Sequence, residues 1–386
     1  MIIKDKKVAI VGGGPGGLTL ARLLQLKGAD VTVYERDANR EVRVQGSTLD
    51  LHDDSGLKAL EQAGLMDAFK ARYRPGADLM RVADSQANLV YDQHQEVNVQ
   101  AFGEAHFRPE IDRGPLRDIL LDSLHPGTVV WNSYMIGLIP DGQSWLLQFK
   151  NGNTERADII IGADGANSRI RKSVTDIAPV YSGLTMIEGT VYDSATNAPR
   201  MTELTKGGKI FALGDNKTLV TSAKGDGSLS FYTGCQKEES WIRDSGIDFN
   251  DHQQLLDWFR SEYAGWSQIW EELFNNKHTS FIPRPQYYMP LEQNWQAKDN
   301  ITLIGDAAHV MPPYAGEGVN MAMQDALELC ECLTGNKHKD LRSAVADYEE
   351  RMRKRAAEAA AMTLEQTAVL HAPDAINSLL RIFTMV

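Results

Sequence analysis

Val8-Ala9-Ile10-Val11-Gly12-Gly13-Gly14-Pro15-Gly16-Gly17-Leu18 joins an apolar run to a glycine-rich turn, and this stretch decides the fold. Residues 7–11 predict a buried parallel strand, and residues 18–27 predict the helix that follows the turn. Gly12, Gly14 and Gly17 have G-x-G-x-x-G spacing. In this spacing the first glycine permits a tight turn, the second lets a pyrophosphate approach the backbone, and the third lets helix and strand pack closely. The phosphates are expected at the free N–H groups where the helix begins.

A second apolar run, residues 31–35, predicts another strand, which ends at Glu35. The acid stands about 20 residues after the glycines, as the dinucleotide-binding fingerprint requires. A carboxylate here can accept hydrogen bonds from both hydroxyls of an adenosine ribose, and it repels a 2′-phosphate. The tightly bound nucleotide is therefore predicted to be FAD or NAD rather than NADP. Arg36 leaves a second interpretation open, because a guanidinium can accept that phosphate or stack on the adenine of FAD.

Length, composition and charge limit the possible partners. The 386 residues, 42% of them hydrophobic, suffice for two packed domains or one large one. A net charge of −12 argues against nucleic acid and anionic membranes, which attract a basic face. No stretch approaches the roughly 18 apolar residues of a membrane span, and the few cysteines favour a reducing cytoplasm. Cys330 and Cys332 would not face each other on a helix, so no metal site is predicted.

The predicted secondary structure changes along the chain. Residues 108–178 and 301–333 alternate short apolar strands with helices, which is typical of an α/β sheet. Residues 78–99 and 179–285 consist mainly of strand-like runs. The runs of 78–99 predict strands on another layer, and those of 179–285, set between Gly, Asn and Asp turns, predict an antiparallel sheet that forms its own domain. Residues 343–370 predict one long Ala-rich helix.

Two further turns each follow a buried strand. One is Ala163-Asp164-Gly165-Ala166-Asn167-Ser168, and the other is Ile304-Gly305-Asp306-Ala307-Ala308-His309. Packing alone does not readily explain three nucleotide-type turns in one chain. Together with residues 12–17 they resemble the motifs of the aromatic-hydroxylase family of FAD-dependent monooxygenases, and the resemblance covers almost the whole chain. In that family the D-G motif is linked to both FAD and NADPH, and the aspartate of the G-D motif binds the ribityl chain.

Within the family the chain most resembles the tetracycline-inactivating monooxygenases, over residues 33–37, 46–52 and 305–320. The resemblance implies an α/β fold with a Rossmann-like FAD-binding domain, a β-rich substrate-binding domain and a C-terminal bridging helix. The implied boundaries are 1–75, 100–178 and 286–335 for the FAD-binding domain, 76–99 and 179–285 for the substrate-binding domain, and 343–386 for the bridging helix.

The cofactor residues follow from the motifs and from the resemblance. Gly316-Glu317-Gly318 precedes a predicted helix and would aim backbone N–H groups at the pyrimidine edge of the flavin. A purely structural helix start remains the alternative there, as a simple strand-end turn does at Asp306. The resemblance places Arg43 near the flavin and the entry of NADPH. The residues expected to contact FAD or NADPH are Gly12, Gly14, Pro15, Gly17, Glu35, Arg36, Arg43, Asp50, Arg113, Arg117, Asp164, Asp306, Pro313, Gly316, Gly318, Val319 and Asn320.

The substrate residues are expected on the sheet of residues 179–285. Where tetracycline-inactivating enzymes hold the polar edge of the drug with glutamine and arginine, this chain has Glu188 and Lys209. Strand alternation places Lys209 and Phe211 on one face, and Lys209 is predicted to pair with an anionic phenolate or enolate. The alternative is that both charges are merely solvated at strand ends. The expected substrate residues are Glu188, Lys209, Phe211, Val220, Ser230 and Tyr314.

The expected reaction is hydroxylation with NADPH and dioxygen, with FAD performing the chemistry and no catalytic side chain assigned. His309 is expected to be a packed helix-start residue. The leading substrate is a polycyclic phenol or enol such as a tetracycline, and another aromatic or polyketide metabolite is the alternative. A halogenase or a reductase of lipid chains with this fold, and a flavoprotein that only sequesters an aromatic ligand, remain open. The protein is expected to be a cytoplasmic monomer.

Overall fold

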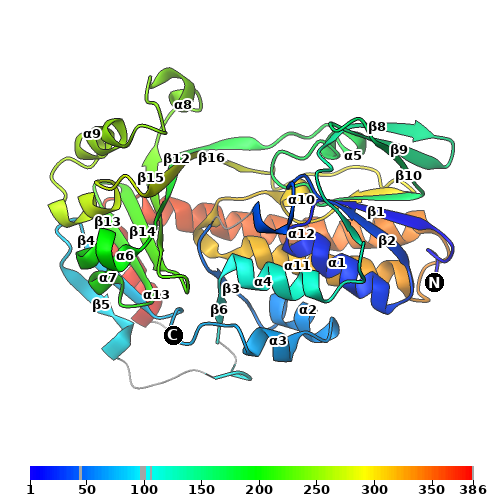
Figure 1. Ribbon diagram of the computed structural model, residues 1–386, viewed down its shortest axis with the longest axis horizontal. Helices are drawn as coiled ribbons and strands as arrows, with labels where there is room; N and C mark the ends of the chain where they lie inside the picture. The colour runs from blue at the N-terminus through cyan, green and yellow to red at the C-terminus, as the bar shows by residue number, and fades with distance from the viewer. Residues whose placement is uncertain (43–45, 96–100, 105–106, 385–386) are drawn as a thin grey trace.

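Two main sheets lie at opposite ends of the long axis of the molecule (Figure 1). The computed structural model describes residues 1–42, 46–95, 101–104 and 107–384. One sheet has five strands and the other has seven, and long helices run between them. The arrangement confirms the predicted fold class, which combines a Rossmann-like part, a β-rich part and a C-terminal bridging helix.

The five-stranded sheet is parallel throughout and carries the glycine-rich turn. Its strands, in spatial order, are β17 (Ile301–Leu303), β11 (Ile159–Gly162), β1 (Lys7–Val11), β2 (Asp30–Tyr34) and β7 (Val129–Val130). Almost every residue of the three strands β1, β11 and β17 is buried, because other elements cover both faces. The strands predicted at 7–11 and 31–35 are therefore confirmed.

Helix α1 (Pro15–Leu26) begins three residues before the predicted start at Leu18. Pro15 occupies the first helical turn, where its missing N–H and fixed φ are tolerated. Two glycines follow it, and their low helix propensity explains why the prediction began too late. Helix α4 (Arg113–Asp122) lies within the stretch 108–178, where the sequence predicts alternating strands and helices. Helix α1 packs along α11 (Glu317–Thr334), which brings the glycine-rich turn close to α11.

The seven-stranded sheet is assembled from two distant parts of the chain. Its strands, in spatial order, are β16 (Thr279–Tyr288), β12 (Val180–Val191), β15 (Leu229–Gln236), β14 (Lys217–Ala223), β13 (Lys209–Gly214), β4 (Met80–Asp84) and β5 (Leu89–Asp92). Neighbouring strands are antiparallel except for β13 and β4, which are parallel. The antiparallel sheet predicted for residues 179–285 is confirmed. The strands within 78–99 do not form another layer as predicted, because β4 pairs with β13 and extends this sheet.

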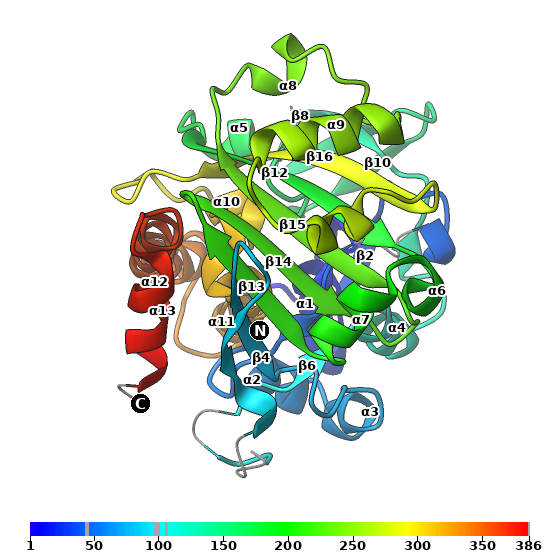
Figure 2. The same ribbon diagram turned by 90° about the vertical axis from the view of Figure 1, so that its left-hand side faces the viewer.

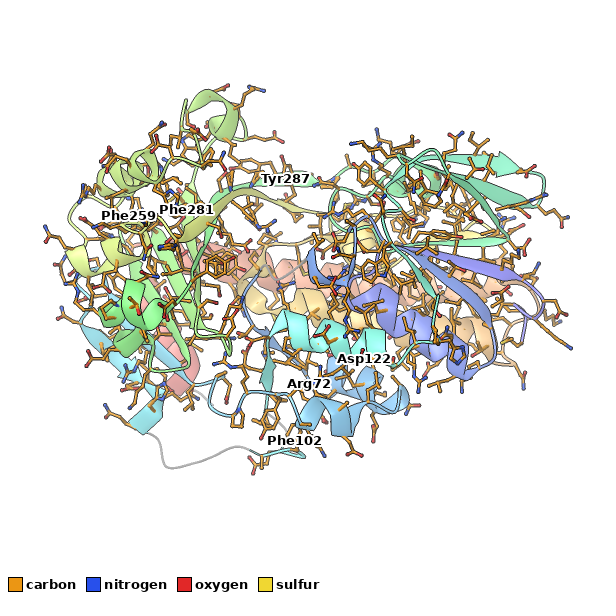
Figure 3. The ribbon with its side chains drawn as sticks, in the orientation of Figure 1. Arg72, Phe102, Asp122, Phe259, Phe281 and Tyr287 are labelled. Carbon is orange, nitrogen blue, oxygen red and sulfur yellow. The ribbon has the colours of Figure 1, made fainter. Side chains whose placement is uncertain are left out.

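An aromatic cluster covers the outer face of this sheet (Figures 2 and 3). Helix α9 (His252–Glu262) places Phe259 on Phe274, with ring centroids 4.3 Å apart, and Phe274 stacks on Phe281 of β16. Three further short elements border the cluster: α6 (Ser194–Asn197), α7 (Pro199–Thr205) and η3 (Gln268–Leu273). The sequence did not predict α6 and α7, because their Ser, Asn, Thr and Pro residues are typical of turns.

Smaller elements complete the fold. A three-stranded antiparallel sheet contains β8 (Met135–Asp141), β9 (Ser144–Phe149) and β10 (Thr154–Ala157). A two-stranded ribbon pairs β3 (Leu49–Asp50) with β6 (Glu110–Ile111). The remaining short elements are η1 (Arg40–Val42), α2 (Gly56–Gln62), α3 (Met66–Lys70), η2 (Gln93–Gln95), α5 (Arg171–Val174), α8 (Trp241–Asp244), α10 (Asp306–His309) and η4 (Pro313–Ala315).

The long helix α12 (Leu341–Leu370) contacts both ends of the molecule, and the shorter α13 (Ala375–Thr384) follows it (Figure 1). In the first half of α12, Tyr348 packs into the core around the parallel sheet. At its end, Leu370 packs with Val82 and Leu213 of the seven-stranded sheet. Among the described residues, no helix combines the length and the apolar character that crossing a bilayer requires.

Candidate functional site

The first two motif turns touch each other. Gly12 has φ of 116°, and a Cβ atom built on it would lie 2.2 Å from the carbonyl oxygen of Ala163. A Cβ atom on Gly17 would lie 2.2 Å from the carbonyl oxygen of Gly12. Neither position can accept a larger residue without movement of the backbone, so glycine is required for this close approach. The glycine-rich turn and the D-G turn therefore form one surface.

The third turn joins this surface through helix α11. Ala322 of α11 lies 2.9 Å from the Cβ positions of both Gly16 and Gly305. The Asp306 carboxylate in turn lies 3.9 Å from the Cβ position of Gly318, at the start of α11. All three motif turns thus meet around the N-terminal part of one helix, although they lie far apart in the sequence.

The start of α1 fits the pyrophosphate predicted there. Apart from its chain neighbours, none of the described residues has a heavy atom within 4 Å of the Cβ position of Gly14, so this part of the structure leaves space beside the backbone. No side chain among the described residues caps α1, and its first N–H groups remain available to an anion. Glu35 is 2% exposed, and its carboxylate accepts hydrogen bonds from the backbone N–H groups of Gly13 and Asp37. Each oxygen retains a lone pair, so the acid can still accept a ribose hydroxyl.

The predicted arginines have different surroundings. Arg117 is buried, and it donates to Asp37 at 3.0 Å and stacks over Trp131. Arg36 is exposed next to Glu35. Arg113 donates through Nε to the backbone carbonyl of Ser47 at 3.2 Å, and so connects α4 to the segment before β3. Arg43 lies outside the described residues.

Asp306 is oriented toward open space. Its side chain is accessible to solvent, and none of the described residues donates a hydrogen bond to its carboxylate. Surrounding protein nevertheless raises the pKa of this carboxyl group, and the charges of His309, Arg113 and Arg171 only partly oppose that effect. A solvent-accessible carboxylate with free acceptor sites fits the ribityl hydroxyls of FAD.

Two other cofactor candidates use their side chains within the protein. Asp164 accepts hydrogen bonds from the Ser168 hydroxyl at 2.6 Å and the Arg169 N–H at 2.8 Å, so it shapes the D-G turn. Asn320 accepts from the His52 N–H and donates to the Asp50 carbonyl, each at 2.9 Å. Asn320 is fully buried and therefore fixes β3 against α11. The Asn320 side chain is thus committed to the protein, whereas Asp164 Oδ1 accepts only from Ser168 and retains a lone pair.

The loop before α11 contains the remaining predicted cofactor positions. Pro313 begins η4, Gly316 has φ of 70°, and Gly318 and Val319 lie in the first turn of α11. The Asp50 carboxylate of β3 lies 3.0 Å from the Cβ position of Gly316. The start of α11, Asp306 and Asp50 are therefore neighbours.

A buried charge cluster lies beside Asp50. Lys209 of β13 forms an ion pair with Glu110 of β6, whose side chain is 1% exposed. Burial raises the pKa of Glu110, and Lys209 only partly opposes this. Burial would lower the pKa of Lys209, but the carboxylates of Glu110 and Asp50 outweigh it and raise that pKa. Lys209 is thus held protonated by protein carboxylates, rather than by solvent or a ligand.

The inner face of the seven-stranded sheet gathers the predicted substrate residues. Cross-strand pairing places Phe211, Val220, Tyr232 and Glu188 in one row across β13, β14, β15 and β12. Lys209, Ser222 and Ser230 form the neighbouring row. The prediction that Lys209 and Phe211 share a face is confirmed, because Ile210 between them belongs to the aromatic cluster on the outer face.

Glu188 is also paired within the protein. Its side chain is 4% exposed and forms an ion pair with Arg284 of β16, which is 45% exposed. The alternative that Glu188 and Lys209 are solvated strand-end charges is therefore wrong. Sequence analysis missed both Arg284 and Tyr232, whose hydroxyl accepts a hydrogen bond from the Ser47 N–H at 3.0 Å. Strand alternation would have placed Tyr232 on this face, but Arg284 could be found only from the pairing of β16 with β12.

Tyr314 lies in η4 and connects the loop before α11 to the seven-stranded sheet and to the end of α12. Its hydroxyl lies 2.9 Å from the hydroxyl of Thr218 on β14 and 3.2 Å from His371 Nε2 at the end of α12. Burial raises the pKa of this phenol, so it stays protonated. A protonated hydroxyl with two partners is consistent with the predicted role as a pocket wall.

His309 is packed, as predicted. It is 2% exposed and its Nε2 lies 2.6 Å from Asp325 Oδ2. Asp325 also accepts a hydrogen bond from the Gly305 N–H at 2.8 Å and from Arg355 at 2.6 Å. The His309–Asp325–Arg355 cluster supports the G-D turn through the hydrogen bond from the Gly305 N–H to Asp325. Sequence analysis gave no indication of Asp325 or Arg355.

Sequence comparison identifies the family of this chain and several relatives. A family model described as FAD binding domain matches residues 5–363. The monooxygenase asqM of Emericella nidulans is 30% identical over 97% of this chain and 94% of its own length. The 3-amino-4-hydroxybenzoate 2-monooxygenase PtmB3 of Streptomyces platensis is 28% identical over 97% of this chain and 91% of its own.

Solved structures agree in fold. The tetracycline destructase Tet(55) superimposes with a TM-score of 0.73 at 21% identity, over 96% of this chain and 90% of its own. At this level of identity the likeness shows the fold alone, and it does not establish the predicted resemblance to tetracycline-inactivating enzymes. The family model and the full-length sequence relatives, in contrast, both indicate a flavin-dependent monooxygenase. The chain belongs to the FAD-binding family of flavin-dependent monooxygenases.

Proposed function

We propose that this protein is an NADPH- and dioxygen-dependent FAD monooxygenase that hydroxylates a polycyclic phenol or enol, with tetracycline-type antibiotics as the leading substrates. The proposal rests on the contact between the inner face of the seven-stranded sheet and the loop that leads into α11. The row of Phe211, Val220, Tyr232 and Glu188 belongs to the same sheet face as Thr218, which contacts Tyr314 of the loop leading into α11. An aromatic and apolar surface with one polar end suits a flat ring system that bears oxygen atoms.

FAD, when bound, supplies the exchange of electrons with NADPH and the activation of dioxygen. The chain supplies position and electrostatics. The open N–H groups of α1 and the Asp306 carboxylate would hold the pyrophosphate and the ribityl chain. The first N–H groups of α11 lie at the positive end of a long helix, where they favour negative charge on a bound ring.

The cation that would meet an anionic substrate differs from the one that the sequence suggested. The charge of Lys209 is already balanced by Glu110 and Asp50. Arg284 lies on the same inner face and is nearly half exposed. Among the described residues, Glu188 is the only carboxylate that forms an ion pair with it. We therefore assign Arg284 the role of pairing with a phenolate or enolate, and Lys209 the role of supporting β13.

The proposal is tested by substrate-stimulated NADPH oxidation. FAD-loaded protein is supplied with NADPH or NADH and with a panel that contains tetracyclines, polycyclic phenols and 3-amino-4-hydroxybenzoate, the last because the relative PtmB3 is named for it. We expect faster NADPH oxidation with a polycyclic substrate, consumption of dioxygen, and a product heavier by one oxygen atom. Turnover of the monocyclic benzoate alone would replace the substrate assignment, and no stimulation by any aromatic compound would contradict the proposed activity.

Variants test the assignment of Arg284. Arg284→Gln should raise the apparent KM for the active substrate and lower the product formed per NADPH, while reduction of FAD without substrate is unchanged. Arg260→Gln is the matched control, because Arg260 pairs with Glu271 on an exposed surface outside the inner face. Equal effects of the two substitutions would remove Arg284 from the substrate site.

A further inference from the structure

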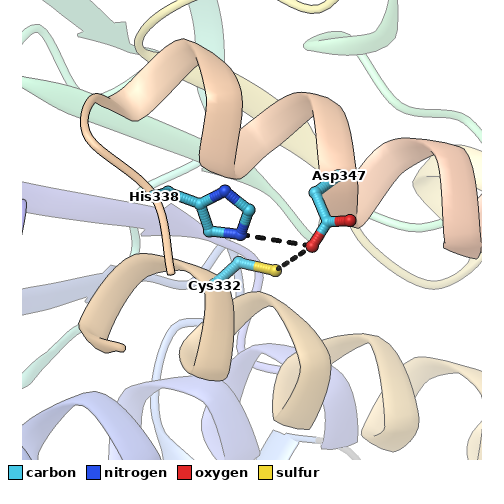
Figure 4. A group of neighbouring side chains, drawn as sticks. All are labelled: Cys332, His338 and Asp347. Carbon is cyan, nitrogen blue, oxygen red and sulfur yellow. Dashed lines mark hydrogen bonds and ion pairs between the residues drawn. The ribbon is translucent and has the colours of Figure 1, made fainter. Parts of the chain in front are cut away.

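A thiol, an imidazole and a carboxylate converge where α11 leads into α12 (Figure 4). Cys332 lies in the last turn of α11, His338 in the connecting loop, and Asp347 in the second turn of α12. Their potential ligand atoms all lie within 4.8 Å of one another. Along α11, Cys332 lies about 22 Å from Glu317, where the helix begins beside the predicted FAD residues. The cluster is therefore separate from the candidate FAD site.

Two of the three separations between these atoms are close to those around a tetrahedral ion, and the third is at most 4.8 Å. Asp347 Oδ2 lies 3.7 Å from Cys332 Sγ and 3.2 Å from His338 Nε2. With bond lengths of about 2.0–2.3 Å, tetrahedral zinc holds a sulfur and an oxygen ligand about 3.5 Å apart and a nitrogen and an oxygen ligand about 3.3 Å apart. Asp347 therefore already lies at about the distance from Cys332 and from His338 that one shared tetrahedral ion requires.

The ring nitrogen of His338 gives a second, independent indication. The His338 side chain is only 9% exposed, and its Nε2 makes no hydrogen bond of good geometry with any described residue. It is directed at the Asp347 carboxylate, as Figure 4 shows. A buried polar atom without a hydrogen bond is uncommon and requires an explanation such as a ligand.

Two side-chain cations lie at the same place. Lys337 Nζ is 2.9 Å from Asp347 Oδ2, and Arg351 Nη2 is 2.9 Å from Cys332 Sγ. Their side chains are 71% and 41% exposed, so both can turn into solvent. The cluster therefore attracts positive charge, and these two cations would compete with a metal ion.

We propose that Cys332, His338 and Asp347 bind one zinc ion, with water as the fourth ligand, and that the ion fastens the end of α11 to α12. Sulfur, nitrogen and oxygen ligands in tetrahedral arrangement favour zinc over magnesium or calcium. The Cys332 thiol releases its proton to solvent as the zinc–sulfur bond forms. The sequence predicted no metal because Cys330 and Cys332 diverge on their helix, but the three ligands come from three different elements.

The site is tested on FAD-loaded protein without a histidine tag, after dialysis against a chelator. Cobalt(II) is added first, because a tetrahedral cobalt–thiolate site absorbs at longer wavelengths than oxidised flavin. Zinc is then titrated in competition with a chromophoric chelator. We expect one ion per chain, and a midpoint of thermal unfolding that rises with zinc concentration.

Variants identify the ligands. Cys332→Ser should abolish the cobalt–thiolate band and weaken zinc binding by more than about 100-fold, the upper end of the effect of losing an outer-shell partner. Cys330→Ser is the matched control, because its thiol contacts Thr334 on another side of α11 and should leave both readouts unchanged. Lys337→Ala should tighten zinc binding by about two- to fivefold, because an exposed competing ion pair is removed.

Two results would overturn the site. One is the absence of saturable zinc binding in the unmodified chain. The other is equal zinc affinity in Cys332→Ser and Cys330→Ser. Retained FAD and a normal unfolding transition in metal-free buffer establish that Cys332→Ser is folded, so loss of binding in that variant reports on the ligand.

Discussion

Replacing Asp325 by asparagine tests how the G-D turn is supported. Asp325 is fully buried and accepts hydrogen bonds from three donors, namely the Gly305 N–H, His309 Nε2 and Arg355 Nη2. Asparagine has nearly the same shape, but it carries no charge and presents an N–H₂ group to one of those donors. The substitution therefore removes the fully buried one of the two carboxylates that pair with Arg355, leaving only Glu328, and places two donors against each other.

The expected loss is large. Removing one partner of a buried ion pair lowers the free energy of unfolding by about 3–5 kcal/mol. Because Asp325 also fixes the Gly305 N–H beside Asp306, we expect FAD to dissociate more readily as well. Asp118→Asn is the control: Asp118 pairs with Arg40 at a surface where the two side chains are 42% and 40% exposed, and its loss should change the free energy by less than about 1 kcal/mol.

The assay is denaturant unfolding of the FAD-loaded protein between about pH 6 and about pH 9, around the ordinary histidine pKa. Burial lowers the pKa of His309, but Asp325 outweighs it, and the net pKa is raised. The stabilisation from protonated His309 is therefore complete below about pH 6.5, the unfolded-state value, and is lost as the pH rises through the folded pKa. Asp325→Asn should remove this decline. An unfolding free energy within about 1 kcal/mol of the unmodified protein would refute the reasoning.

Three further outcomes are expected. Asp306→Ala should weaken FAD binding by about 1–3 kcal/mol, measured by flavin fluorescence, and unchanged affinity would remove Asp306 from the site. Lys209→Met should lower the free energy of unfolding by about 3–5 kcal/mol, and adding Glu110→Gln should restore most of it; a double variant as unstable as the single one would contradict their pairing. Tyr314→Phe, which removes the hydroxyl contact with His371, should cost about 1–2 kcal/mol of stability in denaturant unfolding and lower the product formed per NADPH, whereas wild-type values for both would show that the hydroxyl is dispensable.

The elements predicted correctly are those with strong local signals. Residues 7–11 and 31–35 are continuous apolar runs that end at a glycine turn and at Glu35, and both form buried parallel strands. The long helix was predicted from the helix propensity of its Ala, Glu, Arg and Met residues, and it begins two residues earlier than expected. The inner-face register of Phe211 also followed from simple alternation.

The pairings were not predictable, because they depend on distant segments. The sequence around Lys209 does not indicate whether this lysine pairs with Glu110 or with a ligand. The two residues are distant in the sequence and meet only where β13 passes the β3–β6 ribbon. The charge of Glu188 is likewise balanced by Arg284 across β12 and β16. A charge in a strand therefore indicates that a partner exists, but not whether that partner is protein or substrate.

The parallel contact between β4 and β13 also bears on how the chain folds during synthesis. Met80 and Lys209 are paired across about 130 residues of intervening chain, and such non-local contacts form late and slowly. On the ribosome, β4 and β5 emerge well before the strand that receives them. Until β13 has been translated, the hairpin of β4 and β5 can offer an open edge to other chains, and unpaired edges of this kind promote aggregation. Overproduction of this protein should therefore depend on slow translation or on chaperones more strongly than its final stability would suggest.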